Sequence, residues 1–135
     1  MDLASLDMEA AADKGATLTL RHPRTDEDLT DDNGKPMTVT VLGAESGEFK
    51  RIIADLHRKA QGRKKSPTLA EQERQTVDML VRVTTGWDGI QWEGKALAFN
   101  AENCRMVYAE RPWIRRQVDE FIADAANFPE TALSS

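Results

Sequence analysis

The histidines and the cysteine are the residues of this 135-residue chain best suited to bind a transition metal. Transition-metal sites usually draw their ligands from close pairs such as C-x-x-C or H-x-x-x-H. His22, His57 and Cys104 lie far apart and form no such pair. The sequence therefore predicts no transition-metal site.

The acidic stretch "DEDLTDDNGK", residues 26–35, resembles the start of a calcium-binding loop. Such a loop requires carboxylates at its first and twelfth positions and a glycine at its sixth. If Gly34 is the sixth position, Leu29 is the first and Thr40 the twelfth. Neither is a carboxylate, so we interpret the stretch as a solvated hairpin loop.

Catalytic signatures are absent from the sequence. It contains no G-x-S-x-G, no G-x-x-x-x-G-K-[ST] and no G-x-G-x-x-G. Cys104 lies among apolar residues of a predicted helix, which is typical of a small core residue. Acidic residues are abundant, but none occupies an apolar segment of the kind that favours acid–base catalysis. We expect a protein that is not an enzyme and that uses no cofactor.

One segment, "HRKAQGRKK" at residues 57–65, is strongly basic in a chain of net charge −5. It could contact phosphates or an acidic partner, or it could be a solvated helix end whose cations suit the helix dipole. No aromatic residues are interleaved to stack on bases, which argues against nucleic acid. The candidate contacts for an acidic partner are Arg58, Lys59, Arg63, Lys64 and Lys65.

The tryptophans and the last predicted helix, residues 111–128, also have two interpretations. Large aromatic residues usually fill a core, but Trp is also enriched at the centres of protein interfaces. We expect Trp113, Val118 and Phe121 to pack inward, and one of the three tryptophans to be partly exposed. The candidate partner-binding residues are Trp113, Ile114, Ile122, Phe128 and Trp92.

The predicted elements that position these residues define an α+β fold. Alternating apolar residues predict a β-hairpin over 16–42, with Asn33-Gly34 as a turn signal. Its strands could enclose a wide loop or pair again near Leu29. Helical periodicity predicts a short helix at 6–14 and a mainly α-helical part, 46–128, of about four helices, one of them ending at Gly86. We expect one domain, 1–135, with flexible ends at 1–5 and 129–135, and neither a signal peptide nor a membrane span.

An ordered set of segments resembles a known family along nearly the whole chain. The strongest are "TGWDGI", "FNAENCRMVY" and "PWIRRQVDEFIADAANF", and "GATLTLRHPRT" and "DDNGKPMTVTVLGAES" precede them. Together they resemble the tail assembly chaperones of long-tailed bacteriophages and prophages. The resemblance carries over no catalytic residue.

The resemblance implies a non-enzymatic helper that acts in the host bacterial cytoplasm and is absent from the mature virion. Its expected partners are the tape measure protein, which it would bind and keep soluble, and the tail-tube protein, which it would recruit. A longer frameshifted form of the same chain is a further expected partner. Amphipathic helices could supply the apolar grooves that such a client requires.

Two other classes of protein stay open. One is a structural virion protein, such as a tail completion or connector subunit, which requires ring-forming interfaces. The other is a small nucleic-acid-binding regulator that uses residues 57–65, for which salt-sensitive DNA binding would be expected. The net charge of −5 argues against the second class.

Overall fold

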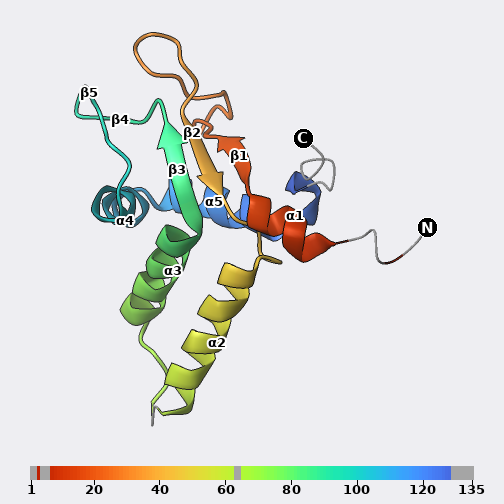
Figure 1. Ribbon diagram of the computed structural model, residues 1–135. Coiled ribbons are helices and arrows are strands. Elements are labelled where there is room, and N and C mark those ends of the chain that lie inside the picture. Colours follow the sequence, from red (N-terminus) through yellow and green to blue (C-terminus); the bar gives the residue numbers. More distant parts are fainter. Residues whose placement is uncertain (1–2, 4–6, 63–64, 129–135) are drawn as a thin grey trace.

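The computed structural model describes residues 3, 7–62 and 65–128 of the chain. Its helices and strands combine in an α+β arrangement (Figure 1). The elements are α1 (Met8–Lys14), β1 (Ala16–Thr19), β2 (Thr38–Val41), α2 (Gly47–Gln61), α3 (Leu69–Val83), β3 (Thr84–Asp88), β4 (Gln91–Trp92), β5 (Lys95–Ala96), α4 (Ala101–Glu110) and α5 (Pro112–Ala123). A 3-10 turn, Ala125–Asn127, follows α5.

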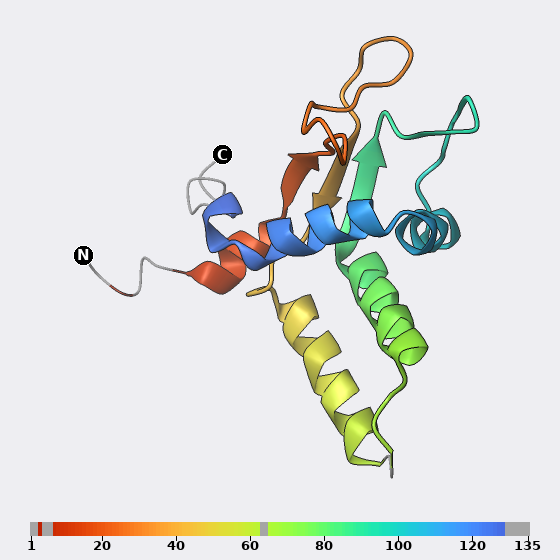
Figure 2. The same ribbon diagram turned by 180° about the vertical axis from the view of Figure 1, so that it is seen from behind.

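A three-stranded antiparallel sheet has the strand order β1-β2-β3. β1 and β2 form the predicted hairpin, in which Leu18 lies opposite Val39, and β3 places Trp87 on the other side of Val39. Because side chains alternate between the faces of a strand, Leu18, Val39 and Val41 are buried on one face while threonines occupy the other. α5 crosses the buried face, as the two opposite views show (Figures 1 and 2).

The long connection of the hairpin pairs again near Leu29. The Leu29 N–H donates to the Leu20 carbonyl, and the Met37 N–H donates to the Leu29 carbonyl. At the tip, the Asp31 carboxylate accepts hydrogen bonds from two backbone N–H groups of the turn. Gly34 there has φ +81°, a conformation that glycine adopts without steric cost. Of the two arrangements left open, the inner pairing is the one observed.

Helix starts follow the expected capping chemistry. The side chains of Ser46, Thr68 and Asn100 each accept a hydrogen bond from the backbone N–H three residues later and begin α2, α3 and α4. Pro112 is the first residue of α5, where its missing N–H costs little. Asp7 caps α1 in the same way as the other caps.

Two element boundaries differ from the predictions, while the number of helices agrees with them. The described residues contain five α-helices: α1, where a short helix was predicted at 6–14, and four after the hairpin, where about four were predicted. The predicted helix ending at Gly86 stops at Val83; Thr84 turns extended, with φ −87° and ψ 122°, and a third strand begins. The predicted helix over 111–128 stops at Ala123, where Asp124 turns extended and its carboxylate caps the 3-10 turn.

α2 and α3 extend together away from the sheet, and we call this pair the helical arm (Figures 1 and 2). The residues that the arm buries lie near its base: Ile52 from α2, and Val77, Leu80 and Val83 from α3. The apolar residues Ile53, Ala60 and Leu69 are exposed, Leu69 by 73%. Towards the tip of the arm, no other described element covers the helices that carry them.

Candidate functional site

A cavity of about 370 Å³ lies between the hairpin connection, β4 and the start of α5. We call it the tryptophan pocket, because Trp92 and Trp113 both line it and both are half-buried. Leu20, Leu29 and Met37 of the hairpin complete an apolar wall. The pocket thus brings together three of the five candidate partner-binding residues, Trp92, Trp113 and Ile114, from segments that are separate in the sequence.

A tight turn positions Trp92. β4 and β5 pair antiparallel, with Trp92 opposite Lys95, and only Glu93 and Gly94 connect them. Both connecting residues have positive φ, 52° and 79°, as in the type I′ turns that suit two-residue hairpins. The Arg111 guanidinium lies 4.6 Å from the centroid of the Trp92 ring, a cation–π contact. The ring is therefore held at the edge of the pocket.

The partner-binding role expected for Ile122 and Phe128 is not supported by their positions, whereas Ile114 lines the tryptophan pocket with little exposed surface. The residues Ile114, Val118 and Ile122, spaced four apart, form the face of α5 that packs on the sheet and are at most 8% exposed. Phe128 is 4% exposed and packs edge to face on Phe121, with 5.6 Å between ring centroids. The predicted division of α5 was wrong in this respect, because the sheet covers the stripe centred on Val118.

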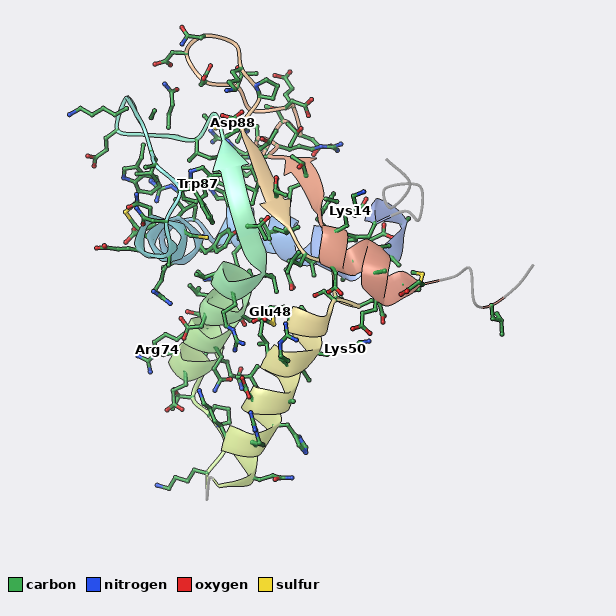
Figure 3. The ribbon with its side chains drawn as sticks, in the orientation of Figure 1. Lys14, Glu48, Lys50, Arg74, Trp87 and Asp88 are labelled. Carbon is green, nitrogen blue, oxygen red and sulfur yellow. The ribbon has the colours of Figure 1, made fainter. Side chains whose placement is uncertain are left out.

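The third tryptophan is also half-buried, but it is held inside the fold. The Trp87 indole N–H donates to the Leu97 carbonyl at 2.8 Å, and the Trp87 ring packs edge to face on Phe99. Trp87 lies on β3, away from the helical arm (Figure 3). All three tryptophans are therefore partly exposed, where one was expected to be.

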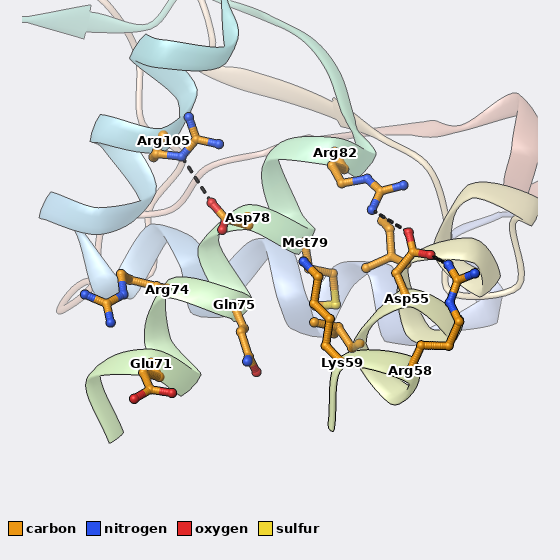
Figure 4. A pocket seen from close by; sticks show the side chains of 12 residues that line it. Asp55, Arg58, Lys59, Glu71, Arg74, Gln75, Asp78, Met79, Arg82 and Arg105 are labelled. Carbon is orange, nitrogen blue, oxygen red and sulfur yellow. Dashed lines mark hydrogen bonds and ion pairs between the residues drawn. The ribbon is translucent and has the colours of Figure 1, made fainter. Parts of the chain in front are cut away.

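A second concavity, of about 900 Å³, lies along the helical arm (Figure 4). We call it the arm groove; its apolar floor consists of Ile52, Leu56 and Met79. Arg58 and Lys59 of the basic segment line it, and Lys65 borders a smaller hollow beyond it. Arg63 and Lys64 lie outside the described residues.

Charged side chains hold the base of the arm. The Arg82 guanidinium donates to both Glu48, at 2.8 Å, and Asp55, at 3.4 Å, so it joins the end of α3 to α2. Asp55 also pairs with Arg58. Hydrogen bonds from Arg51 and Arg82 hold the pKa of Glu48 below its ordinary value. Arg58 is thus partly engaged inside the arm.

The residues first considered for metal binding or nucleophilic chemistry have structural contacts. The buried Cys104 lies in α4, and burial raises the pKa of its thiol to about 11. The ring Nδ1 of His22 accepts hydrogen bonds from the N–H groups of Arg24 and Thr25. Among the residues with described positions, no group of three His, Cys, Asp or Glu side chains could hold a metal ion.

Comparison with known proteins assigns no family. No protein-family model, curated protein or solved structure matches the chain. In the described part of the chain, no helix is both long and apolar enough to cross a membrane. A proposal about function therefore depends on the tryptophan pocket, the arm groove and the resemblance noted in the sequence.

Proposed function

We propose that the chain is a phage tail assembly chaperone, a non-catalytic protein that binds the tape measure protein and keeps it soluble while it recruits tail-tube subunits. It would act in the host bacterial cytoplasm and be absent from the mature virion. The resemblance in the sequence supplies this identity. The tryptophan pocket is the structural observation that carries it.

The pocket has the chemistry that a client with exposed apolar side chains requires. Trp92 and Trp113 are large and stiff, so they bury apolar area on binding while losing few rotamers. Gln91, Glu93 and Arg111 border the pocket with polar groups. An apolar wall with a polar rim is the usual composition of a protein-binding site. A helical client could insert apolar side chains spaced three or four residues apart.

The test is co-expression of the chain with the tape measure protein, and separately with the tail-tube protein, of the phage or prophage that encodes it. We expect wild-type chain to keep tape measure protein in the soluble fraction and to co-purify with it. Trp92→Ala and Trp113→Ala should reduce the recovered complex at least about tenfold, as expected for truncating interface tryptophans.

Phe99→Ala is the matched control, because it also removes an exposed aromatic side chain, 38% exposed, but one that does not line the pocket. Thermal unfolding of each variant separates lost binding from lost folding. If the tape measure protein is not retained and the chain is found in purified virions, the structural-protein alternative replaces the proposal. Salt-sensitive DNA binding by the chain would instead favour the regulator.

A further inference from the structure

The arm groove has the dimensions of a site for one more helix. It lies between two helices of 15 residues each, which at 1.5 Å per residue are about 22 Å long. Packed helices lie about 8–10 Å apart, so a third helix beside α2 and α3 would contact both. The floor it would meet is apolar: Ile52 is buried, and Leu56 and Met79 are half-buried.

The arm also lacks the packing that usually stabilises helices. Amphipathic helices in proteins gain most of their stability from burial of one face. All residues of α2 are described, and Ile52 alone among them is buried. In α3 the buried residues belong to the second half of the helix. A third helix on Leu56 and Met79 would therefore add apolar burial to the arm.

The charge of the groove indicates which kind of helix fits. Five basic and three acidic side chains line it, a net charge of +2 in a chain of net charge −5. Two of the acidic side chains already form ion pairs (Figure 4). Asp55 pairs with Arg58 and Arg82, and Asp78 pairs with Arg105.

Two cations of the groove remain available. Within the described ranges, no carboxylate pairs with Lys59 on α2 or with Arg74 on α3. Lys65 lies beside Leu56 and Lys59 in the hollow towards the tip and extends the positive charge. The groove therefore has an apolar floor between cations that can each take an acidic partner group.

We propose that the arm groove binds an amphipathic helix of a partner protein, one whose apolar stripe is flanked by acidic side chains. The inference depends on the residues of the groove alone and holds whichever client the tryptophan pocket takes. A nucleic acid would gain nothing from the apolar floor of the groove, whereas an amphipathic helix would bury its apolar stripe there. A second copy of the chain is distinguished from a partner protein by the test.

The probes are three fluorescent peptides of about 18 residues, which as helices of about 27 Å are long enough to span the groove. The first has leucines at helical spacing flanked by glutamates. The second keeps the leucines and has lysines in place of the glutamates, and the third keeps the glutamates and has serines in place of the leucines. Anisotropy with the full chain should show binding of the first peptide, and binding at least about tenfold weaker for the other two.

Charge reversal in the groove makes the test specific. Lys59→Glu with Arg74→Glu should weaken the glutamate peptide about tenfold and strengthen the lysine peptide, an exchange of preference that misfolding cannot produce. Leu56→Gln with Met79→Gln should abolish binding of the glutamate peptide and of the lysine peptide. The matched control is Lys95→Glu with Arg116→Glu, which changes net charge equally at exposed positions outside the groove.

Three results would overturn the inference. The first is binding of the glutamate and lysine peptides with equal affinity, or binding of the glutamate peptide that the groove variants leave unchanged. The second is sedimentation of the wild-type chain as a dimer that Leu56→Gln with Met79→Gln dissociates, which would assign the groove to a second copy. The third is salt-sensitive binding of duplex DNA that Lys59→Glu with Arg74→Glu removes.

Discussion

The Arg82 guanidinium donates two hydrogen bonds to the Glu48 carboxylate, from Nη2 at 2.8 Å and from Nε at 3.1 Å. This contact joins the first turn of α2 to the last turn of α3 and fixes the width of the arm groove at its base. The same carboxylate accepts hydrogen bonds from Arg51 in its own helix. Because these hydrogen bonds hold the pKa of Glu48 below its ordinary value, the stability of the helical arm depends on pH at Glu48.

Glu48→Gln should lower the free energy of unfolding at pH 7. At pH 3 the variant and the wild type should differ less. The pKa of Glu48 is lowered in the folded chain, so its stabilisation is present above the ordinary value of 4.5 and is lost as pH falls through the lowered value. Ion pairs at the surface contribute less than about 1 kcal/mol. Urea unfolding should therefore give Glu48→Gln a slightly smaller free energy of unfolding than wild type at pH 7, and this difference should disappear at low pH.

Glu45→Gln is the control for this titration. It removes the same charge as Glu48→Gln, but at an exposed residue that directly precedes the Ser46 cap of α2. A deficit of Glu48→Gln that is equal at pH 7 and pH 3 would mean that shape, and not charge, stabilises this contact.

A second pair of residues joins the start of β3 to α4 inside the core. The Thr84 hydroxyl donates to the Leu80 carbonyl at 2.6 Å and lies 2.7 Å from the Tyr108 hydroxyl. Because the single Thr84 hydroxyl hydrogen is already used, Tyr108 is the donor in their contact. Thr84→Val would leave the buried Tyr108 hydroxyl without this acceptor, whereas Tyr108→Phe would remove the donor itself.

Thr84→Val should therefore cost more stability, about 1–3 kcal/mol, than Tyr108→Phe, about 0.5–1.5 kcal/mol. The double variant should cost less than the sum of the two, because the two groups interact. Urea unfolding of all four proteins measures the cycle. Additive effects, or a larger cost for Tyr108→Phe, would contradict the assigned donor.

Local features of the fold could be predicted from the sequence. The caps Ser46, Thr68 and Asn100 were predictable because a cap is determined by residues within one turn. The hairpin followed from alternation and from the turn at Gly34. β3 was not predicted, because Thr84 and Thr85 continue a helical pattern. Their extended conformation depends on pairing with β2, which is far away in the sequence.

The candidate site was predictable residue by residue but not as a site. Trp92 and Trp113 were both named as partner-binding candidates, yet only the fold brings them to one pocket. Ile114 and Ile122 were assigned to the wrong side of α5, because two adjacent apolar residues leave the buried face ambiguous until the covering element is known. The arm groove depends on the separation of α2 and α3, which no local pattern determines.

Gly89→Ala should destabilise the fold more than Gly34→Ala or Gly62→Ala. Gly89 has φ +71°, and a Cβ there would lie 2.5 Å from the Pro36 carbonyl oxygen. Gly34 has φ +81° with no atom near its Cβ position, so Gly34→Ala measures backbone strain alone, about 1–2 kcal/mol. Gly62 lies in the α region with φ −85°, where alanine is tolerated.

Thermal unfolding of the three variants should thus give the order Gly62→Ala, Gly34→Ala and Gly89→Ala from most to least stable. The extra cost at Gly89 comes from the contact between the segment before β2 and the segment after β3. Equal effects of Gly34→Ala and Gly89→Ala would mean that this contact relaxes without cost.

Cys104 should be inert towards thiol reagents in the folded chain. Its side chain is fully buried, and burial raises its pKa to about 11, so at pH 8 it is neither accessible nor ionised. The reagent 5,5′-dithiobis-(2-nitrobenzoate) should therefore label it only slowly at pH 8, and at once when urea unfolds the chain, with one thiol released per chain.

The same burial predicts how stability depends on pH at the alkaline end. Because the folded pKa of Cys104 lies above the ordinary value of 9.0, its stabilisation is full below pH 9 and is lost as pH rises towards about 11. The advantage of wild type over Cys104→Ala in urea unfolding should narrow over this range, since alanine does not titrate. Rapid labelling of the native chain at pH 8, or an advantage that stays constant to pH 11, would show that the thiol is exposed to solvent.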